Sequence, residues 1–262
     1  MTNVGIIGGT GQLGSAIATA WLETRTVLPE NLWVSNRSGG AGSLAKWEEI
    51  RSTTDPQQLA ANCDVIVLCV PPAEANSLKL AAGDAIVISV MAGVELSDLM
   101  SISGTNRVVR AMSSPAAAFQ LAYSPWFAPH SLSEDDTALV TRLLSACGLT
   151  DRIPTEDQID HFTAMTGPVP GFVAYFADAV YEHAVKQGIA DHVAQRAVQQ
   201  LFLASSHVLA REGGPPREFV QEMIDYDGTT AAGLRALDQG PLKEAVSEGL
   251  VAAYDRTRSI GK

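Results

Sequence analysis

Short apolar runs alternate with helical patterns along the first 154 residues of the chain. The runs are rich in β-branched residues and cover 4–7, 32–35, 65–70, 85–90 and 107–110. Helices are predicted over 11–23 and over 133–147, the second with a capped start at Ser133, and 121–129 is predicted to be strand and then loop. Near-continuous apolar strands are typical of a sheet that helices cover on both faces. This half therefore predicts an α/β fold with a doubly wound parallel sheet.

The strand pattern disappears after Pro154 and helical spacing takes over. Helices are predicted over 155–165, 171–187, 192–211, 216–224 and 242–260. Thr155 and Gln158 have the spacing of a capping box at the start of the first of these helices. We therefore expect two domains, a nucleotide-binding domain over 1–154 and an all-helical domain over 155–262.

A glycine loop directly follows the first apolar run and opens the first helix. Residues 9–14 fit the pattern G-x-G-x-x-G, which is weak alone but informative between a strand and a helix. Glycine permits the tight turn and lets backbone N–H groups approach a pyrophosphate at the positive end of the helix. This is the fingerprint of a Rossmann domain. The predicted cofactor-binding residues here are Gly9, Thr10, Gly11, Gln12 and Leu13.

The end of the second run predicts which dinucleotide binds. NAD sites usually carry an acidic residue there, which hydrogen-bonds the ribose 2′-hydroxyl. This chain has Asn36, Arg37 and Ser38 instead. An arginine flanked by polar groups can pair with the 2′-phosphate of NADPH and offers NADH no equivalent contact. NADPH is therefore the predicted cofactor, ahead of NADH, with a solvated turn as the plainer alternative.

Composition excludes several classes of function. The formal net charge of −11 argues against nucleic-acid binding, and the hydrophobic content of 46% is enough for a folded core. Cys63, Cys69 and Cys147 are scattered, which favours core packing over a metal site or a disulfide. No metal is predicted. No apolar run is long enough to cross a bilayer and no signal peptide is expected, so the predicted location is cytoplasmic.

The chain resembles the pyrroline-5-carboxylate reductase family along nearly its whole length. The matching segments are the glycine loop with Ala16 and Ile17, then 64–70, 89–94, 107–112, 163–167 and 227–234. The last of these, which reads DGTTAAGL, is the most diagnostic. The resemblance implies a Rossmann domain, a helical domain that pairs with a second subunit, and reduction of a cyclic imine by a nicotinamide cofactor.

The resemblance also implies roles for individual residues. Val70, Pro71 and Ala92 fall in segments that contact the cofactor. Gly228, Thr229 and Thr230 fall where the family binds the substrate, and a hydroxyl there can orient or protonate the imine nitrogen. Without the resemblance, the two threonines would be interpreted as an ordinary N-terminal cap of a helix. The expected assembly is a homodimer or a larger homo-oligomer with the substrate at the subunit interface.

The chain departs from the family at four places. Its glycine loop is one residue longer and resembles that of NADP reductases that use a deazaflavin coenzyme. Pro71-Pro72 replaces a Lys-Pro pair, and 113–115 lacks the asparagine of a Pro-Asn-Thr-Pro turn near the nicotinamide. The segment 225–228 replaces a Ser-Pro-Gly-Gly turn and brings in Asp225 and Asp227.

The two aspartates make more than one class of substrate compatible with the sequence. Carboxylates beside a substrate carboxylate would repel it, so the pocket is also compatible with a neutral or cationic imine or amine. Alternatively, both aspartates cap the next helix and face water. Three functions are therefore carried forward: reduction of pyrroline-5-carboxylate to proline, reduction of another imine, and a non-catalytic NADP-binding regulator. A deazaflavin-dependent reductase explains the glycine loop but not the helical half.

Overall fold

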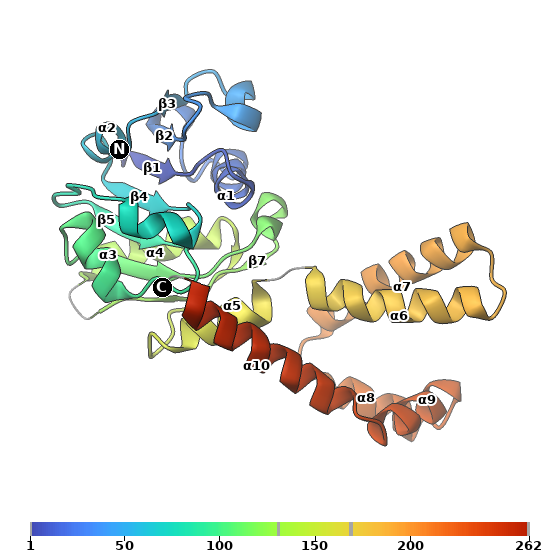
Figure 1. Ribbon diagram of the computed structural model, residues 1–262. Helices are drawn as coiled ribbons and strands as arrows, with labels where there is room; N and C mark the ends of the chain where they lie inside the picture. The colour runs from blue at the N-terminus through green and yellow to red at the C-terminus, as the bar shows by residue number, and fades with distance from the viewer. Residues whose placement is uncertain (1, 130–131, 168–169, 261–262) are drawn as a thin grey trace. The chain divides into compact units, whose positions relative to one another are not determined.

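The computed structural model describes residues 2–129, 132–167 and 170–260 and contains a seven-stranded sheet (Figure 1). The strand order is β3-β2-β1-β4-β5-β6-β8, the arrangement of a Rossmann sheet with one added edge strand. All neighbours pair in parallel except β8, which runs antiparallel to β6. The strands are β1 (Val4–Ile7), β2 (Leu32–Ser35), β3 (Arg51–Thr53), β4 (Val65–Leu68), β5 (Ile86–Ser89), β6 (Val108–Ala111) and β8 (Trp126–Phe127).

Helices cover both faces of this sheet. On one face, α1 (Gln12–Glu23) and α4 (Glu134–Ser145) share a buried core with Ile6, Val67 and Ile88 of the central strands. On the other face, α2 (Pro56–Ala60) and α3 (Leu96–Ser103) share a second core with Ile66 and Val87. Alternate residues of one strand therefore enter different cores. This arrangement confirms the predicted doubly wound α/β fold.

Short elements fill the connections. The short 3₁₀ helices are η1 (Pro29–Asn31), η2 (Gly42–Lys46), η3 (Pro72–Ser77) and η4 (Pro115–Phe119). The segment predicted as strand and then loop holds two short strands: β7 (Ala122–Tyr123) pairs in parallel with β9 (Gly148–Leu149), and β8 joins the main sheet. The predicted cap of α4 is confirmed, because Ser133 and Asp136 form a capping box.

The rest of the chain is helical. It contains α5 (Gln158–Thr166), α6 (Gly171–Lys186), α7 (Asp191–Glu212), α8 (Pro216–Asp225), α9 (Thr229–Asp238) and α10 (Leu242–Ile260). The predicted capping box of Thr155 and Gln158 is wrong, because α5 begins at Gln158 after Asp157 and has no side-chain cap. No helix among the described residues is both long and apolar enough to span a membrane.

Contacts within the chain divide it into two compact units. The first comprises 1–169 and 251–262, and the second comprises 170–250. The first unit thus contains the Rossmann sheet, α5 and the last turns of α10. In the second unit, α6 packs against α7 and α8 packs against α9. The predicted domain division after residue 154 stays a prediction.

Candidate cofactor and substrate sites

The glycine loop between β1 and α1 is held by backbone contacts that leave no room for side chains. Gly8 has a φ of 85°, and the N–H groups of Gly8 and Gly9 donate to the carbonyl of Ser35 at 2.8 and 3.2 Å. A Cβ atom on Gly14 would lie 2.4 Å from the Gly8 carbonyl oxygen. Gly11 is the N-cap of α1 and offers no side-chain acceptor, so the first N–H groups of the helix are available to an anion.

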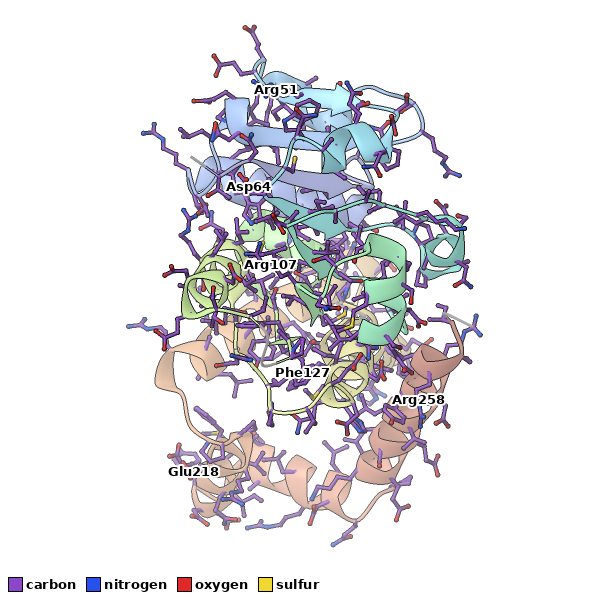
Figure 2. The ribbon with its side chains drawn as sticks, turned by 90° about the vertical axis from the view of Figure 1, so that its left-hand side faces the viewer. Arg51, Asp64, Arg107, Phe127, Glu218 and Arg258 are labelled. Atoms are coloured by element: carbon purple, nitrogen blue, oxygen red, sulfur yellow. The ribbon has the colours of Figure 1, made fainter. Side chains whose placement is uncertain are left out.

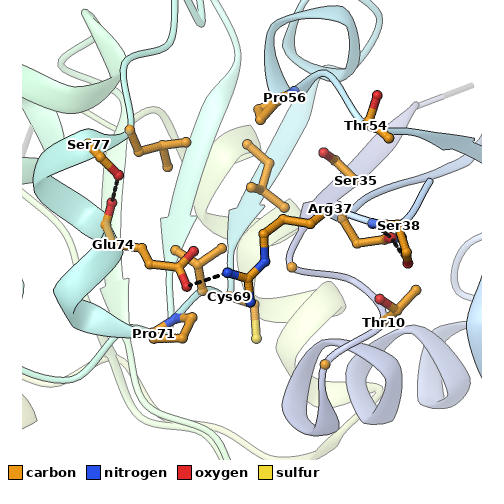
Figure 3. A pocket seen from close by; sticks show the side chains of 16 residues that line it. Thr10, Ser35, Arg37, Ser38, Thr54, Pro56, Cys69, Pro71, Glu74 and Ser77 are labelled. Atoms are coloured by element: carbon orange, nitrogen blue, oxygen red, sulfur yellow. Dashed lines mark hydrogen bonds and ion pairs between the residues drawn. The ribbon is translucent and has the colours of Figure 1, made fainter. Parts of the chain in front are cut away.

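A cavity of about 540 Å³ opens at the carboxyl ends of β1, β2 and β4, beside this loop (Figure 3). Ligands of doubly wound sheets bind at this edge, where the strand order reverses. Seven of the predicted cofactor residues line it: Thr10, Gly11, Asn36, Arg37, Ser38, Val70 and Pro71. Gly9, Gln12, Leu13 and Ala92 do not line it; the first three lie in the loop and the first turn of α1, and Ala92 follows β5.

Asn36 builds the turn after β2. Its Oδ1 accepts hydrogen bonds from the N–H groups of Ser38 and Gly39 at 3.0 and 2.9 Å and from the Ser38 hydroxyl at 2.7 Å. Its Nδ2 donates to the Gly40 carbonyl at 2.7 Å. The Asn36 amide is thus occupied by the turn itself. The neighbouring Arg37 side chain is left 92% exposed and is available to a ligand.

The structure adds residues to the cavity that the sequence did not indicate. Glu74 in η3 faces Arg37, with 3.7 Å between Oε1 and Nη1, and Thr54 and Ser77 contribute hydroxyl groups (Figure 3). Among the described residues that line the cavity, Arg37 and Glu74 are the two charged ones. No pattern in the sequence identified Glu74 as a residue of the cavity, because η3 is a short 3₁₀ helix without α-helical periodicity.

The cysteines are not nucleophiles at neutral pH. Cys69 lines the cavity, and burial raises the pKa of its thiol to about 12. Burial also raises the pKa values of Cys63 and Cys147 to about 12. A thiol with such a pKa stays protonated, so it acts as a small apolar group. All three cysteines are free, and no group of three or more His, Cys, Asp or Glu in the described residues is arranged to hold a metal.

A buried ion network lies where β6 approaches α5. Arg110 is 1% exposed and donates from Nη2 to Asp160 and from Nη1 to Glu156, the latter at 3.3 Å. Glu156 also accepts from the Leu96 N–H at the start of α3, at 2.7 Å. A second contact joins the same two elements: the hydroxyl of Thr163 in α5 lies 3.4 Å from the sulfur of Met112, directly after β6. The network therefore ties α5 and the turn before it to β6 and to the start of α3.

The predicted substrate residues lie together at the turn between α8 and α9. Asp225 ends α8, Asp227 has a φ of 57°, and Gly228 is the N-cap of α9. Thr229 and Thr230 form the first turn of α9, so neither is the N-cap. Asp225 accepts from Gln221 Nε2 at 2.7 Å and Asp227 pairs with Arg235 at 2.7 Å. In the alternative interpretation both aspartates cap the helix and face water. The capping part is wrong, because Gly228 is the N-cap and no side chain caps the helix, but both aspartates are exposed as that interpretation expected.

Fold and cavity together define a dinucleotide-binding oxidoreductase, and known proteins specify its family. Residues 156–260 match the model for pyrroline-5-carboxylate reductase dimerisation, and residues 3–93 match that for coenzyme F420-dependent NADP oxidoreductases. The pyrroline-5-carboxylate reductase of Aquifex aeolicus is 30% identical over 98% of this chain and 97% of its own length. The chain belongs to the pyrroline-5-carboxylate reductase family.

Solved structures agree with this assignment. The pyrroline-5-carboxylate reductase of Coxiella burnetii is 25% identical, has a TM-score of 0.86, and is matched over 100% of this chain and 99% of that one. The pyrroline carboxylate reductase of Plasmodium falciparum, solved with NADP bound, is 22% identical with a TM-score of 0.83, over 100% and 98% of the two chains. The predicted family, enzyme class and fold are confirmed, and the second half carries the family's dimerisation domain.

Proposed function

We propose that this protein reduces pyrroline-5-carboxylate to proline with NADPH, in a homodimer or larger homo-oligomer whose subunit interface holds the substrate. The observation that carries the proposal is the cavity beside the glycine loop, with Arg37 at its opening, in a full-length member of the reductase family. The predicted cytoplasmic location accompanies this proposal.

The cofactor follows from the charges of the cavity. The N–H groups at the start of α1 suit the pyrophosphate, and Arg37 suits the 2′-phosphate that distinguishes NADPH from NADH. No carboxylate lies at the end of β2 to bind a free 2′-hydroxyl. The NADP oxidoreductase model over 3–93 and the NADP-bound relative from Plasmodium falciparum support the same cofactor.

The chemistry needs few groups from the protein. NADPH, when bound, supplies a hydride to the carbon of the C=N bond, and the nitrogen must take a proton. The Thr230 hydroxyl, with Thr229 beside it, is the group proposed to orient that proton. The uncapped N–H groups at the start of α9, after Gly228, suit the substrate carboxylate.

The pairing of Asp227 favours a carboxylate substrate. Arg235 offsets the charge of Asp227, and both side chains are more than half exposed, so their remaining field is screened. Asp225 instead accepts a hydrogen bond from the Gln221 amide, which carries no charge to offset that of the carboxylate. Asp225 is therefore the observation that supports the second candidate, a neutral or cationic imine.

A substrate panel tests the proposal. NADPH oxidation is followed at fixed enzyme concentration with pyrroline-5-carboxylate, with the same ring lacking the carboxylate, and with a cationic cyclic imine. Turnover of pyrroline-5-carboxylate at the highest kcat/KM supports the proposal. A preference for either carboxylate-free ring supports the second candidate, and tight NADPH binding without any turnover supports a regulator.

Thr230 is tested by two matched substitutions. Thr230→Val removes the hydroxyl and keeps the shape, and we expect kcat to fall by about a hundredfold, within the range of general acid–base effects. Thr230→Ser retains the hydroxyl and is expected to keep activity within about tenfold of wild type. Equal kcat values for the two variants would remove Thr230 from the mechanism.

A further inference from the structure

Two opposite charges face each other across the cofactor cavity, and each comes from a fixed stretch of backbone. Arg37 lies within the turn that the Asn36 amide holds with four hydrogen bonds, to Ser38, Gly39 and Gly40. Glu74 lies in η3, where its N–H donates to the Pro71 carbonyl at 2.9 Å and its carbonyl accepts from the Ser77 hydroxyl at 2.8 Å. The buried Ala75 anchors the same turn in the core.

The two charged side chains point toward each other across the cavity. Figure 3 shows Arg37 extending from the β2 side toward Glu74 on the η3 side. The Arg37 side chain is 92% exposed and that of Glu74 is 40% exposed, and their charged atoms are 3.7 Å apart. An exposed pair at this distance is weak, so an incoming dianion can displace the carboxylate from the guanidinium. Because the backbone of η3 holds Glu74, the displaced carboxylate then remains near the guanidinium and the bound dianion.

We propose that Glu74 is a specificity-determining residue that lowers the affinity for NADPH relative to NADH. The inference rests on the proposed NADPH site, where the 2′-phosphate pairs with Arg37. Glu74 then acts twice against the phosphate: it competes for the guanidinium before binding, and it repels the bound dianion afterwards. NADH carries a neutral hydroxyl at the same place, so neither effect applies to it.

Substitution of Glu74 tests the inference by direct binding. Kd values for NADPH and NADH are measured by titration calorimetry on the full chain, without imine substrate. Glu74→Gln removes the charge and keeps an amide oxygen as acceptor. We expect the Kd for NADPH to fall about two- to fivefold, the range of an exposed ion pair, and the Kd for NADH to stay within about twofold. The gain for NADPH should shrink in 0.5 M salt, because screening weakens exposed charges.

Glu30→Gln is the matched control. Glu30 is exposed and lies in η1, at the amino end of β2 and therefore at the opposite edge of the sheet. Glu30→Gln changes the net charge by the same amount as Glu74→Gln. Its effect on the Kd for NADPH therefore measures the contribution of the molecule's overall charge. An NADPH Kd that is unchanged or higher in Glu74→Gln, a gain no greater than in Glu30→Gln, or equal shifts for the two cofactors would overturn the inference.

Arg37→Gln separates this inference from the proposed function. If its Kd for NADPH rises no more than its Kd for NADH, the 2′-phosphate does not bind at Arg37 and the cofactor assignment fails. If Arg37→Gln lowers the preference for NADPH but Glu74→Gln does not raise it, the Glu74 inference alone fails. In the double variant the effect of Glu74→Gln should be smaller, because no guanidinium remains to compete for.

Discussion

Arg110 brings a full positive charge into the interior of the first unit. Its side chain is 1% exposed, and the carboxylates of Asp160 and Glu156 hold its terminal nitrogens. Its Nε is buried and has no hydrogen-bond partner among the described residues. A buried ion pair costs desolvation energy and is weak support for stability as a whole. Removing one carboxylate is strongly destabilising, because the Arg110 charge then stays buried without full compensation.

We therefore expect Asp160→Asn to lower the free energy of unfolding by about 3 kcal/mol, measured by urea denaturation at pH 7. The matched control is Glu23→Gln, which breaks an exposed pair with Lys46 in the same unit at 3.8 Å. Its cost should stay below about 1 kcal/mol. Similar costs for the two variants would show that the Arg110 network does not depend on burial.

At the scale of elements, α4 is fixed to the sheet by charge as well as by packing. Arg107 lies directly before β6 (Figure 2). Asp136 closes the capping box with Ser133 and accepts hydrogen bonds from Arg107, at 2.5 Å from Nη2. Burial alone raises the pKa of Asp136. Hydrogen bonds from Arg107 and Ser133 outweigh it and hold the pKa below its ordinary value.

A depressed pKa makes the contribution of Asp136 to stability depend on pH. The contribution is fully present above the unfolded-state pKa near 4 and is lost as pH falls through the lower folded-state pKa. We expect Asp136→Asn to cost about 1–2 kcal/mol of unfolding free energy at pH 7, and the difference from wild type to shrink below pH 4.

The control for this prediction is Asp135→Asn, which removes an exposed carboxylate from the same helical turn. It tests the interaction of a first-turn charge with the helix dipole and should cost at most about 1 kcal/mol. Urea unfolding curves collected between pH 2.5 and pH 7 measure both variants. A constant difference between Asp136→Asn and wild type across this range would refute the assignment.

At the scale of the whole molecule, the helical unit leaves many apolar side chains exposed. Phe172, Phe176, Leu201, Leu203 and Val246 are between 44% and 54% exposed within one chain. So many exposed apolar side chains in one unit favour an interface with another chain, and the dimerisation model covers the same residues. The proposed homo-oligomer buries this surface.

We expect Leu203→Asp to weaken the assembly, because a charge placed in an apolar interface loses its hydration without a partner. Light scattering coupled to size exclusion should show a shift toward monomer, and imine reduction should fall with it if the substrate site needs two subunits. Gln187→Asp adds the same charge at the exposed end of α6 and serves as control. A monomeric Leu203→Asp variant with full activity would contradict an interface site.

The sequence by itself determined the Rossmann fold, because its evidence is local. An apolar strand, a glycine turn and a helix start follow one another within residues 4–23, and the backbone geometry there excludes side chains. Helices α6, α7 and α10 were equally predictable from apolar periodicity. Arg37 was identified because the end of β2 has a fixed role in this fold. The start of α5 was not predicted correctly, because Thr155 and Gln158 have the right spacing but residues 156–157 form a turn and the helix begins only at Gln158.

Only the tertiary structure decided the partners of these residues. Glu74 lies 37 positions after Arg37 and Asp160 lies 50 positions after Arg110, so no local pattern joins them. The sheet brings the carboxyl ends of β2 and β4 to one edge, which sets Glu74 opposite Arg37. The Arg235–Asp227 pair is different, because its two residues are only eight positions apart and α9 follows directly on the turn that holds Asp227. Long-range pairing of charges depends on the packed fold, and local spacing carries no information about it.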